Sequence, residues 1–410
     1  MRVLIKAAAA PDAVRLATRE RPVPGPGELL LQVEAVGICG TDLSLYAWHQ
    51  EIVDLYHPPL PLIMGHEFSG RVVSVGPEVA GFAAGELVAV NPIKQCGHCL
   101  YCQTGKTNLC DHRLMLGTQE PGAFAEYVVV PATHAIALPD KVGGDVAALC
   151  EPFCVALHAL ERVPVHGKTV AVAGAGPIGL LVLVAALASG AERCLVTGLN
   201  QDARRLDLAA TLGAHPVNVS DQDPVDVVKE VTAGQGADVV FETAGLPTAV
   251  SQAIALARKG GRVRLLGLPH APTAIATNAI AAREQELIGV RAYTPRTWQT
   301  CKALVPAIAP QLALLVSHRF ALEDFDKAFG VAIFKEAIKV VLCPAPRVAS
   351  EGHSGTDLAG GQQEVQGDDH IYSLHASAQD GLAGDHLCIR GPRRDARRWR
   401  NGRRKEQRRE

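Results

Sequence analysis

The chain has 410 residues, 48% of them hydrophobic and 20% charged, with a formal net charge of −2. The length suggests two or three domains, and the composition is that of an ordinary globular protein with an ample core. The near-neutral charge makes nucleic acid an improbable partner, and the longest apolar run, residues 178–188, is too short to cross a bilayer.

The first residues lack the apolar core and the cleavage site of a signal peptide. The chain has 11 cysteines, an odd number, and several of them follow a metal-binding pattern. This usage is typical of a reducing compartment, so we expect a cytoplasmic protein without a membrane anchor.

Residues 1–150 are rich in glycine, proline and short β-branched runs. Four such runs, each bounded by glycine or proline, predict strands at residues 29–36, 71–75, 87–90 and 125–130. The pattern predicts an all-β or barrel-like first domain over residues 1–150, with long functional loops.

Two glycine-flanked segments in this domain carry metal-ligand side chains. Cys39 lies within residues 37–42, and His66 and Glu67 follow Gly65. A catalytic zinc takes about three protein ligands and keeps one position open, and a thiolate, an imidazole and a carboxylate form a suitable set. The alternative is a small core cysteine and a surface histidine. The flanking glycines favour tight turns that present these side chains to a cleft.

Four further cysteines have the spacing C-x2-C-x2-C-x7-C: Cys96, Cys99, Cys102 and Cys110. Their thiolates can converge on one tetrahedral zinc at about 2.3 Å. A closed four-sulfur site has no room for substrate, so its predicted role is structural. Gly97 and Gly105 leave the backbone free to wrap around the ion.

Glu151 and Pro152 stand just before a predicted helix over residues 153–160. A carboxylate at this position usually interacts with the helix dipole, and that interpretation stays open here. Cys150, Cys154 and His158 lie on or near the same helix and are predicted to fill the core.

Strands and helices alternate from residue 151 to residue 290. Strands are predicted at residues 169–173, 194–197, 238–241 and 262–266, and helices at residues 178–189, 203–212 and 248–257. Such βα units predict a doubly wound parallel sheet, and hence an α/β dinucleotide-binding domain over residues 151–290. Residues 291–344 return to mixed patterning, end in a strand at residues 338–342, and are assigned to the first domain.

A glycine-rich turn follows the first of these strands. The GxGxxG pattern comprises Gly174, Gly176, Pro177, Ile178 and Gly179, between a strand and an apolar helix. In this context backbone amides and the helix N-terminus can hold a pyrophosphate, so the turn predicts a bound NAD or NADP.

The second strand of this unit ends in Gly198 without the usual acid, and Arg204 and Arg205 follow. Losing that carboxylate removes repulsion against a 2′-phosphate, and an arginine would favour one. The alternative is that both arginines are solvated helix residues, so the choice between NAD and NADP stays open.

Residues 345–410 lose all periodicity, and residues 390–410 carry 11 Arg and Lys against three acids. We expect a disordered C-terminal extension. An acidic partner or nucleic acid is the weaker alternative for this segment.

Together these motifs resemble the zinc-dependent medium-chain alcohol dehydrogenases, in particular the polyol (sorbitol-type) and threonine dehydrogenase branch. The resemblance covers about residues 1–343, with its motifs in the family order. The matching segments are residues 37–42, residues 65–67 with Gly70, Gly76 and Val79, the four-cysteine segment, and residues 122–127, 151–152, 174–179, 242–245 and 260–262.

The resemblance implies a GroES-like β-barrel catalytic domain, a Rossmann domain, two zinc ions per chain and reversible oxidation of an alcohol by NAD or NADP. It makes Cys39 and His66 catalytic zinc ligands, and Glu67 a ligand or a close neighbour. Glu151 then bonds the metal or its water. Zinc would act as a Lewis acid, and hydride would pass to the nicotinamide.

The resemblance places Thr41 at the bound alcohol, at the start of a proton relay. Many relatives have a histidine three residues later, where this chain has Ser44. His49 and His57 are candidates to replace it, although loop histidines are more often surface residues.

The expected substrate is a polyol or a related secondary alcohol, and the expected assembly is a dimer or tetramer of this chain. A threonine-type dehydrogenase and an NADPH-dependent carbonyl reductase are the alternatives within the family. A non-catalytic dinucleotide-binding relative is the alternative of another class, but it should have lost the zinc ligands that are present here.

Overall fold

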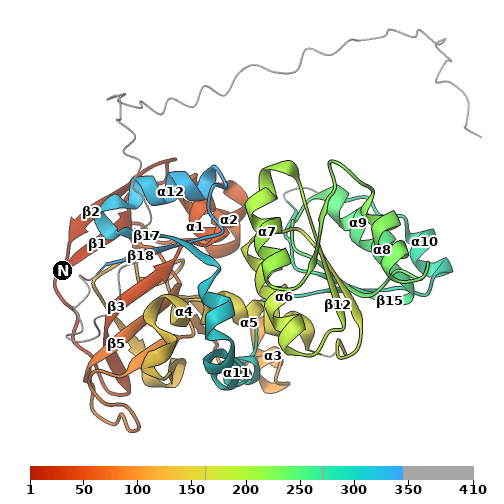
Figure 1. The fold of residues 1–410 in the computed structure, drawn as a ribbon. Coiled ribbons are helices and arrows are strands. Elements are labelled where there is room, and N and C mark those ends of the chain that lie inside the picture. Colours follow the sequence, from red (N-terminus) through yellow and green to blue (C-terminus); the bar gives the residue numbers. More distant parts are fainter. Residues whose placement is uncertain (162, 270–271, 345–410) are drawn as a thin grey trace, which may run out of the picture. The chain divides into compact units, whose positions relative to one another are not determined.

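The computed structural model describes residues 1–161, 163–269 and 272–344, which are built around a mixed sheet and a parallel sheet (Figure 1). The extension predicted at residues 345–410 lies outside the described residues. Among the described residues, no helix is both long and apolar enough to span a membrane.

The mixed sheet combines strands from both ends of the described chain. Its order is β10-β6-β5-β3-β18-β17, and β9 also pairs with β3. Strand β18 runs antiparallel to β3, so the last described strand joins the sheet that β3 begins. The strands are β3 (Glu28–Gly37), β5 (Glu67–Val75), β6 (Leu87–Val90), β9 (Tyr127–Pro131), β10 (Ala135–Ala137), β17 (Val316–Ala321) and β18 (Lys339–Cys343).

Two smaller sheets and several helices accompany this sheet. One sheet comprises β1 (Arg2–Lys6), β2 (Val14–Thr18) and β4 (Leu62–Ile63), and the other β7 (Ile93–Lys94) and β8 (Leu114–Met115). The helices are α1 (Gly40–Tyr46), α2 (Gln50–Tyr56), α3 (Leu100–Gln103), α4 (Gly144–Ala148), α11 (Pro295–Ala313) and α12 (Phe325–Ile333).

The parallel sheet has the order β13-β12-β11-β14-β15-β16, which is the 3-2-1-4-5-6 order of dinucleotide-binding folds. The strand order reverses between β11 and β14, where such folds bind their ligand. The elements are β11 (Thr169–Ala173), α6 (Pro177–Ala188), β12 (Arg193–Gly198), α7 (Ala203–Thr211), β13 (His215–Asn218), α8 (Pro224–Val231), β14 (Ala237–Glu242), α9 (Pro247–Leu256), β15 (Ala257–Leu265), α10 (Thr277–Ala282) and β16 (Glu286–Gly289).

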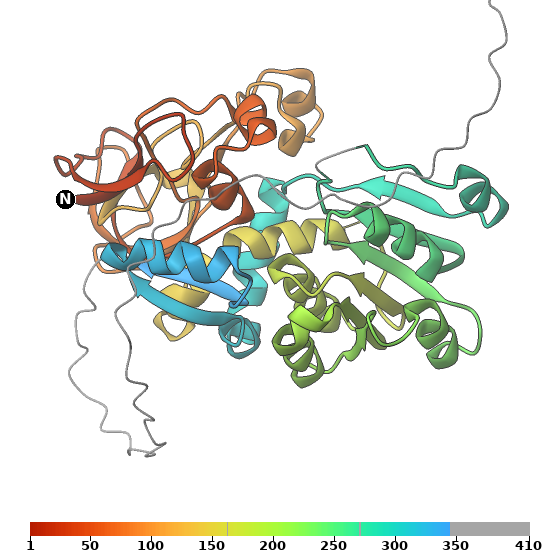
Figure 2. The ribbon, with the colours of Figure 1, turned by 90° about the horizontal axis from the view of Figure 1, so that it is seen from above.

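Helix α5 (Cys150–Leu160) connects the two sheets. It contacts α6 and α11 as well as strands β5 and β6, and Figure 2 shows it between the two parts. One apolar cluster therefore runs from Leu87 through Phe153 to Val172 and Trp298. A carboxylate at the start of α5 is consequently close to both sheets.

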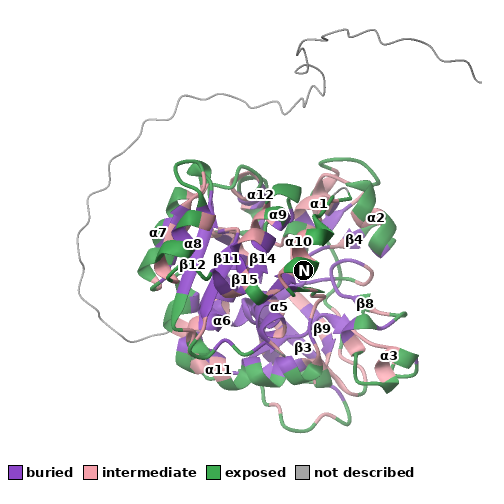
Figure 3. Cartoon of the chain, turned by 90° about the vertical axis from the view of Figure 1, so that its right-hand side faces the viewer, coloured by how far each residue is buried: buried purple, intermediate pink, exposed green. Residues whose placement is uncertain are grey.

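The apolar run at residues 178–188 lies in α6, a largely buried helix that packs against strands of the parallel sheet. Eight of the 12 residues of α6 are buried, and all five residues of β11 are buried as well. Figure 3 shows the central strands β11 and β14 as buried. Strands covered on both faces explain why the sequence here is continuously apolar rather than alternating.

The structure corrects several predicted boundaries. Strand β5 begins at Glu67 rather than at residue 71, and β15 begins at Ala257 rather than at residue 262 because the chain extends through two glycines with an irregular register. The prediction that His158 fills the core is wrong, since its side chain is partly exposed and hydrogen-bonded, whereas Cys150 and Cys154 are fully buried.

Candidate metal centre and dinucleotide site

Cys39, His66 and Glu67 lie together in the structure. Their ligand atoms are all within 4.8 Å of one another, although the residues come from separate elements. Cys39 precedes α1, His66 lies between β4 and β5, and Glu67 is the first residue of β5. The two segments that the sequence singled out are thus brought into one cluster.

Glycines allow the turn before His66 to pack closely. Gly65 has φ +88°, and a Cβ there would lie 2.7 Å from the Phe124 ring. A Cβ on Gly122 would lie 2.2 Å from the Gly65 carbonyl oxygen. Any side chain at either position would push His66 away from the cluster.

Asp42 is a buried partner of this cluster that sequence reasoning assigned no role. Its carboxylate accepts hydrogen bonds from the backbone of Cys39 (2.9 Å) and Gly65 (3.3 Å). Its Oδ1 lies 3.6 Å from His66 Nδ1. Burial opposes protonation of His66, but the negative charges of Asp42 and Cys39 outweigh it and raise the His66 pKa. The aspartate three residues after Cys39, a capping-box position, was the available signal.

Glu67 has a second buried partner in Lys339. Glu67 Oε2 forms an ion pair with Lys339 Nζ, which also donates to the Ile38 carbonyl at 2.9 Å. Burial disfavours the charged ammonium, but Glu67 and Cys39 outweigh this and raise the Lys339 pKa. This lysine lies far along the chain, and no local motif marked it.

Glu151 lies near the cluster but is not one of the residues within 4.8 Å of one another. It is buried in the first turn of α5 and accepts a hydrogen bond from the Tyr293 hydroxyl at 2.8 Å. Burial and the charge of Glu67 raise the pKa of Glu151 to about 7, against the opposing influence of His66. Tyr293 was another residue that no sequence motif indicated.

The predicted proton-relay residues lie around α1 and α2. Thr41 is half-buried in the first turn of α1, and Ser44 is half-buried one turn later. His49 and His57 are exposed, at the two ends of α2.

The four remaining motif cysteines form a second cluster. The sulfur of Cys96 lies 3.5 Å from that of Cys110 and 4.0 Å from that of Cys102. A tetrahedral zinc with bonds of about 2.3 Å separates its sulfurs by about 3.8 Å, so the set fits this metal. Backbone amides of Cys102 and Asp111 lower the pKa of Cys99 to about 6, which favours a thiolate.

The glycine-rich turn has the geometry of a phosphate cradle. A Cβ on Gly179 would lie 2.0 Å from the Gly174 carbonyl oxygen, so the helix sits against the turn. Around Gly176, by contrast, a Cβ would meet nothing within 4 Å. Pro177 and Ile178 begin α6 directly behind this open space, at the positive end of the helix.

Residues from β14 support the turn. The Thr243 hydroxyl donates to the Gly174 carbonyl at 3.0 Å, and Glu242 accepts from the backbone of Ala244 (2.9 Å) and Gly245 (2.7 Å). The segment at residues 242–245 therefore holds the shape of the predicted nucleotide site.

The two arginines after β12 have different surroundings. Arg205 forms an ion pair with Asp202 at 2.9 Å and donates to the Ala337 carbonyl at 2.7 Å. Arg204 is exposed. Arg205 is thus engaged within the protein, and Arg204 is the arginine that faces solvent.

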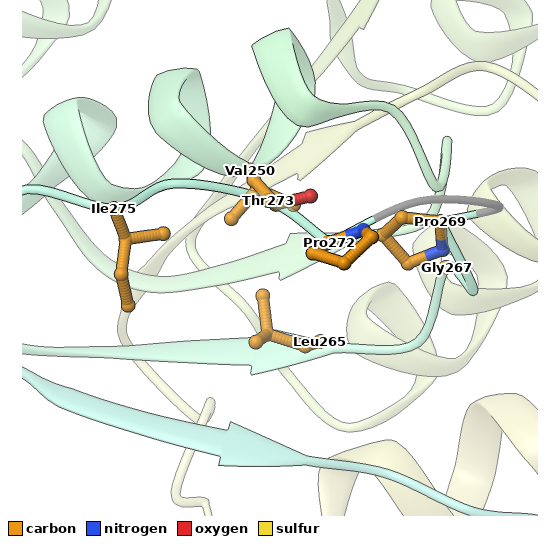
Figure 4. Close-up of a pocket in the computed structure, with 7 residues that line it drawn as sticks. All are labelled: Val250, Leu265, Gly267, Pro269, Pro272, Thr273 and Ile275. Atoms are coloured by element: carbon orange, nitrogen blue, oxygen red, sulfur yellow. The ribbon is translucent and has the colours of Figure 1, made fainter.

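An apolar pocket lies at the end of β15, between α9 and the segment that follows the strand (Figure 4). Its lining carries no titratable side chain, so it offers apolar contact rather than metal chemistry. The lining residues are Val250, Leu265, Gly267, Pro269, Pro272, Thr273 and Ile275.

The two sites fit the groups that the sequence predicted. Cys39, the buried His66 and Glu67 bring together thiolate, nitrogen and oxygen atoms of the kinds that zinc accepts, and His66 Nδ1 has no hydrogen-bond partner in the described part of the chain. The open space at Gly176 suits a pyrophosphate. A metal centre combined with a dinucleotide fold defines a zinc- and nicotinamide-dependent oxidoreductase.

Comparisons with known proteins agree. The chain matches the model of the alcohol dehydrogenase GroES-like domain over residues 25–140 and that of the zinc-binding dehydrogenase over residues 177–308. An L-threonine 3-dehydrogenase from Bacillus licheniformis is 38% identical over 320 residues, which cover 77% of this chain and 91% of that protein.

Two solved structures extend the comparison. A zinc-binding dehydrogenase from Sinorhizobium meliloti bound to NADP has a TM-score of 0.77 and 31% identity, covering 84% of this chain and 99% of that one. Galactitol-1-phosphate dehydrogenase from Escherichia coli has a TM-score of 0.76 and 28% identity, covering 84% of this chain and 100% of that one.

The chain belongs to the zinc-dependent medium-chain alcohol dehydrogenases, in the branch of the threonine and polyol dehydrogenases. The predicted combination of a GroES-like and a Rossmann-like fold is confirmed. The protein is an alcohol dehydrogenase that uses zinc and NAD(P) and acts on a small-molecule alcohol.

Proposed function

We propose that Cys39, His66 and Glu151 hold the catalytic zinc, with Glu67 beside it, and that the enzyme oxidises a polyol-like secondary alcohol bearing an acidic group. The convergence of Cys39, His66 and Glu67 within 4.8 Å, near Glu151, carries the metal assignment. Glu67 is assigned the neighbouring position because its Oε2 pairs with Lys339.

When bound, zinc would supply a Lewis acid for the alcohol oxygen, and NAD(P) would supply a hydride acceptor. Asp42 fixes the turn at Cys39 by accepting a hydrogen bond from the Cys39 amide, and its carboxylate lies 3.6 Å from His66 Nδ1. Thr41 hydrogen-bonds the alcohol, and the proton leaves by Ser44 toward the exposed His49 at the start of α2.

Two arginines near Tyr293, the hydrogen-bond partner of Glu151, favour the acidic group on the substrate. Arg113 and Arg291 are half-buried, and in the described part of the chain neither forms an ion pair with a carboxylate. Burial and the positive charge of Arg291 both lower the pKa of Arg113, which also interacts with Tyr56 and Tyr293. Two neighbouring guanidinium groups without an acid are a natural site for a carboxylate or a phosphate.

The relatives supply matching examples, since L-threonine carries a carboxylate and galactitol-1-phosphate a phosphate. A threonine-type substrate therefore remains the alternative to a sugar acid or sugar phosphate. Both alternatives carry an acidic group, so the proposal predicts that neutral alcohols are not the preferred substrates.

The preference for an acidic substrate is tested by comparing turnover within two matched pairs, each with NAD⁺ and NADP⁺ separately. The pairs are galactitol with galactitol-1-phosphate and L-threoninol with L-threonine. We expect the acidic member of at least one pair to be preferred by about tenfold or more, and Arg113→Gln to reduce that preference. Equal rates within both pairs would contradict the acidic substrate. Absence of turnover with every alcohol would contradict the dehydrogenase assignment.

We further propose a dimer or tetramer of this chain in the cytoplasm. Strand β16 is the edge of the parallel sheet, with Ile288 exposed on it, and pairing with a second copy would cover that edge. None of the ten described cysteines forms a disulfide with another described residue, which suits a reducing compartment. Sedimentation of the full chain checks the assembly.

We keep the division into a catalytic domain (residues 1–150 and 291–344) and a dinucleotide-binding domain (residues 151–290) as a proposal. The pairing of β18 with β3 supports the assignment of the last segment to the catalytic domain.

A further inference from the structure

Tyr293 makes a buried contact with the proposed zinc ligand Glu151. Its hydroxyl donates to Glu151 Oε1 at 2.8 Å, and its side chain is only 1% exposed. The Tyr293 ring stacks on Trp298, with centroids 5.7 Å apart and planes at 23°. The hydroxyl is thus held in place by a fixed ring, and it leaves Oε2 of the carboxylate available.

The four-cysteine lobe, residues 96–110, holds the segment that carries Tyr293. Asn108, between Cys102 and Cys110, donates from Nδ2 to the Arg291 carbonyl at 2.9 Å. Arg291 is two residues before Tyr293, and Asn108 is 9% exposed. This partly buried hydrogen bond fixes the backbone two residues before the tyrosine.

The same asparagine also touches the helix that carries Glu151. Asn108 Nδ2 lies 3.4 Å from His158 Nε2, and His158 Nδ1 lies 2.9 Å from Glu161 Oε2. Glu161 Oε1 in turn accepts from the hydroxyl of Thr297, and the Glu161 carbonyl accepts from Arg264 at 2.8 Å. His158 and Glu151 are seven residues apart, about two turns along α5.

We propose that Tyr293 is a positioning residue for Glu151, and that the four-cysteine lobe keeps both in place through Asn108. The inference rests on the proposed role of Glu151 at the catalytic metal. The inference gives the four-cysteine lobe a second structural role. Besides shaping its own loop, the lobe fixes the position of the Glu151 carboxylate at the proposed catalytic metal site.

Tyr293 can position Glu151 because it binds one of the two carboxylate oxygens and leaves the other available. With Oε1 occupied by the Tyr293 hydroxyl, rotation of the Glu151 carboxylate breaks a buried hydrogen bond and is therefore disfavoured. Partners of this kind orient metal ligands, and their removal commonly weakens metal binding by about 10- to 100-fold. The effect should therefore appear in metal affinity as well as in turnover.

Tyr293→Phe removes the hydroxyl and keeps the ring on Trp298. In competition with a chromophoric chelator, we expect the zinc dissociation constant of the catalytic site to rise by about 10- to 100-fold, with the four-cysteine site unchanged. The absorption bands of cobalt bound at the catalytic site should shift. Tyr101→Phe, in the lobe but without a hydrogen bond to Glu151, is the matched control and should match the unaltered protein.

Asn108→Ala tests the connection to the lobe. We expect the same cobalt shift and a smaller loss of zinc affinity at the catalytic site, although residue 108 does not touch that site. Thr104→Val, which removes hydroxyl bonds that stay within the lobe, should leave the catalytic site unchanged.

Wild-type catalytic-site affinity and spectrum in Tyr293→Phe would overturn the positioning role. An Asn108→Ala protein that keeps its four-cysteine zinc and a wild-type cobalt spectrum would overturn the role of the lobe. These measurements need no substrate, so an incorrect substrate assignment gives a different pattern: normal metal responses without turnover of the proposed alcohols.

Discussion

Lys339 and Glu67 form an ion pair across strand β3, at the one position in that strand where a glycine makes room for it. Strand β3 lies between β5, which begins with Glu67, and β18, which begins with Lys339. A Cβ on Gly37 would lie 2.3 Å from Glu67 Oε2 and 2.9 Å from Lys339 Cε. Gly37, two residues before Cys39, is therefore required by a contact between two other strands.

The first prediction concerns this ion pair. Lys339→Met should lower the free energy of unfolding by about 3–5 kcal/mol, because it leaves the Glu67 carboxylate buried without its counter-charge. Adding Glu67→Gln removes that isolated charge, so the double variant should be more stable than Lys339→Met alone. Denaturant unfolding of Lys339→Met, Glu67→Gln and the double variant measures the three free energies of unfolding. A loss in the double variant equal to the sum of the two single losses would contradict the pairing.

The second prediction separates the two cysteine sites. Metal analysis of the full chain should give about two zinc ions. Cys39→Ser should lower this to about one, with turnover lost and the melting temperature little changed, because that residue serves the open site. Cys99→Ser should also lose about one zinc, but with a clear fall in stability, because its site closes a loop. Equal loss of stability in both variants would contradict this division of roles.

Local motifs revealed the parts of the site that are contiguous in the chain. The strand at residues 169–173 and the turn at Gly174 agree with the prediction, because the glycines that permit this turn lie close together in the sequence. The four-cysteine cluster could be predicted because its thiolates have metal-ligand spacing within one short segment. Cys39 and His66 each lie in a glycine-flanked turn that the sequence marked, but the fold brings these two segments together.

Other parts of the site depend on contacts between distant segments. Lys339 meets Glu67 only because β18 pairs with β3, and Tyr293 meets Glu151 only because its segment packs on α5. Neither residue stands in a pattern of its own. Arg205 was a sequence candidate for a 2′-phosphate contact, but its bond to the carbonyl of the distant Ala337 could not be foreseen from the sequence.

The third prediction concerns the cofactor turn. Gly176→Ala should leave the melting temperature nearly unchanged, because a Cβ there meets no atom within 4 Å, but it should weaken NAD(P)H binding by filling the space for the pyrophosphate. Gly179→Ala should mainly destabilise the fold, because its Cβ would lie 2.0 Å from the Gly174 oxygen. Fluorescence titration with NAD(P)H and thermal unfolding distinguish the two. Unchanged binding in the folded Gly176→Ala protein would exclude this turn as the phosphate site.

The fourth prediction separates the two arginines after β12. Arg204→Ala should lower kcat/KM with NADP⁺ by about tenfold and leave NAD⁺ unaffected, because the exposed guanidinium is the one free to meet a 2′-phosphate. Arg205→Ala should instead lower stability by about 1–3 kcal/mol, through loss of the Asp202 pair and the bond to Ala337. Equal losses with both coenzymes in Arg204→Ala would argue against a 2′-phosphate contact.

The fifth prediction is a pH dependence that comes from Lys6. This side chain is fully buried, with its Nζ 2.8 Å from the Tyr46 carbonyl oxygen and 5.4 Å from the Trp48 ring centroid. Burial lowers the Lys6 pKa to about 8, against a smaller opposing effect of Asp12. In the unfolded chain the pKa returns to about 10.4, so between these values the unfolded state binds more protons.

The free energy of unfolding should therefore rise with pH between about 8 and 10.4, relative to a Lys6→Met variant, by up to about 3 kcal/mol. Below about pH 7 both states carry the proton, and the difference between the two proteins should be constant. Urea unfolding of both proteins across this range measures it. A difference that falls with pH would mean that the carbonyls of Ala10 and Tyr46 and the Trp48 ring hold the ammonium more strongly than burial disfavours it, and that the Lys6 pKa is raised instead.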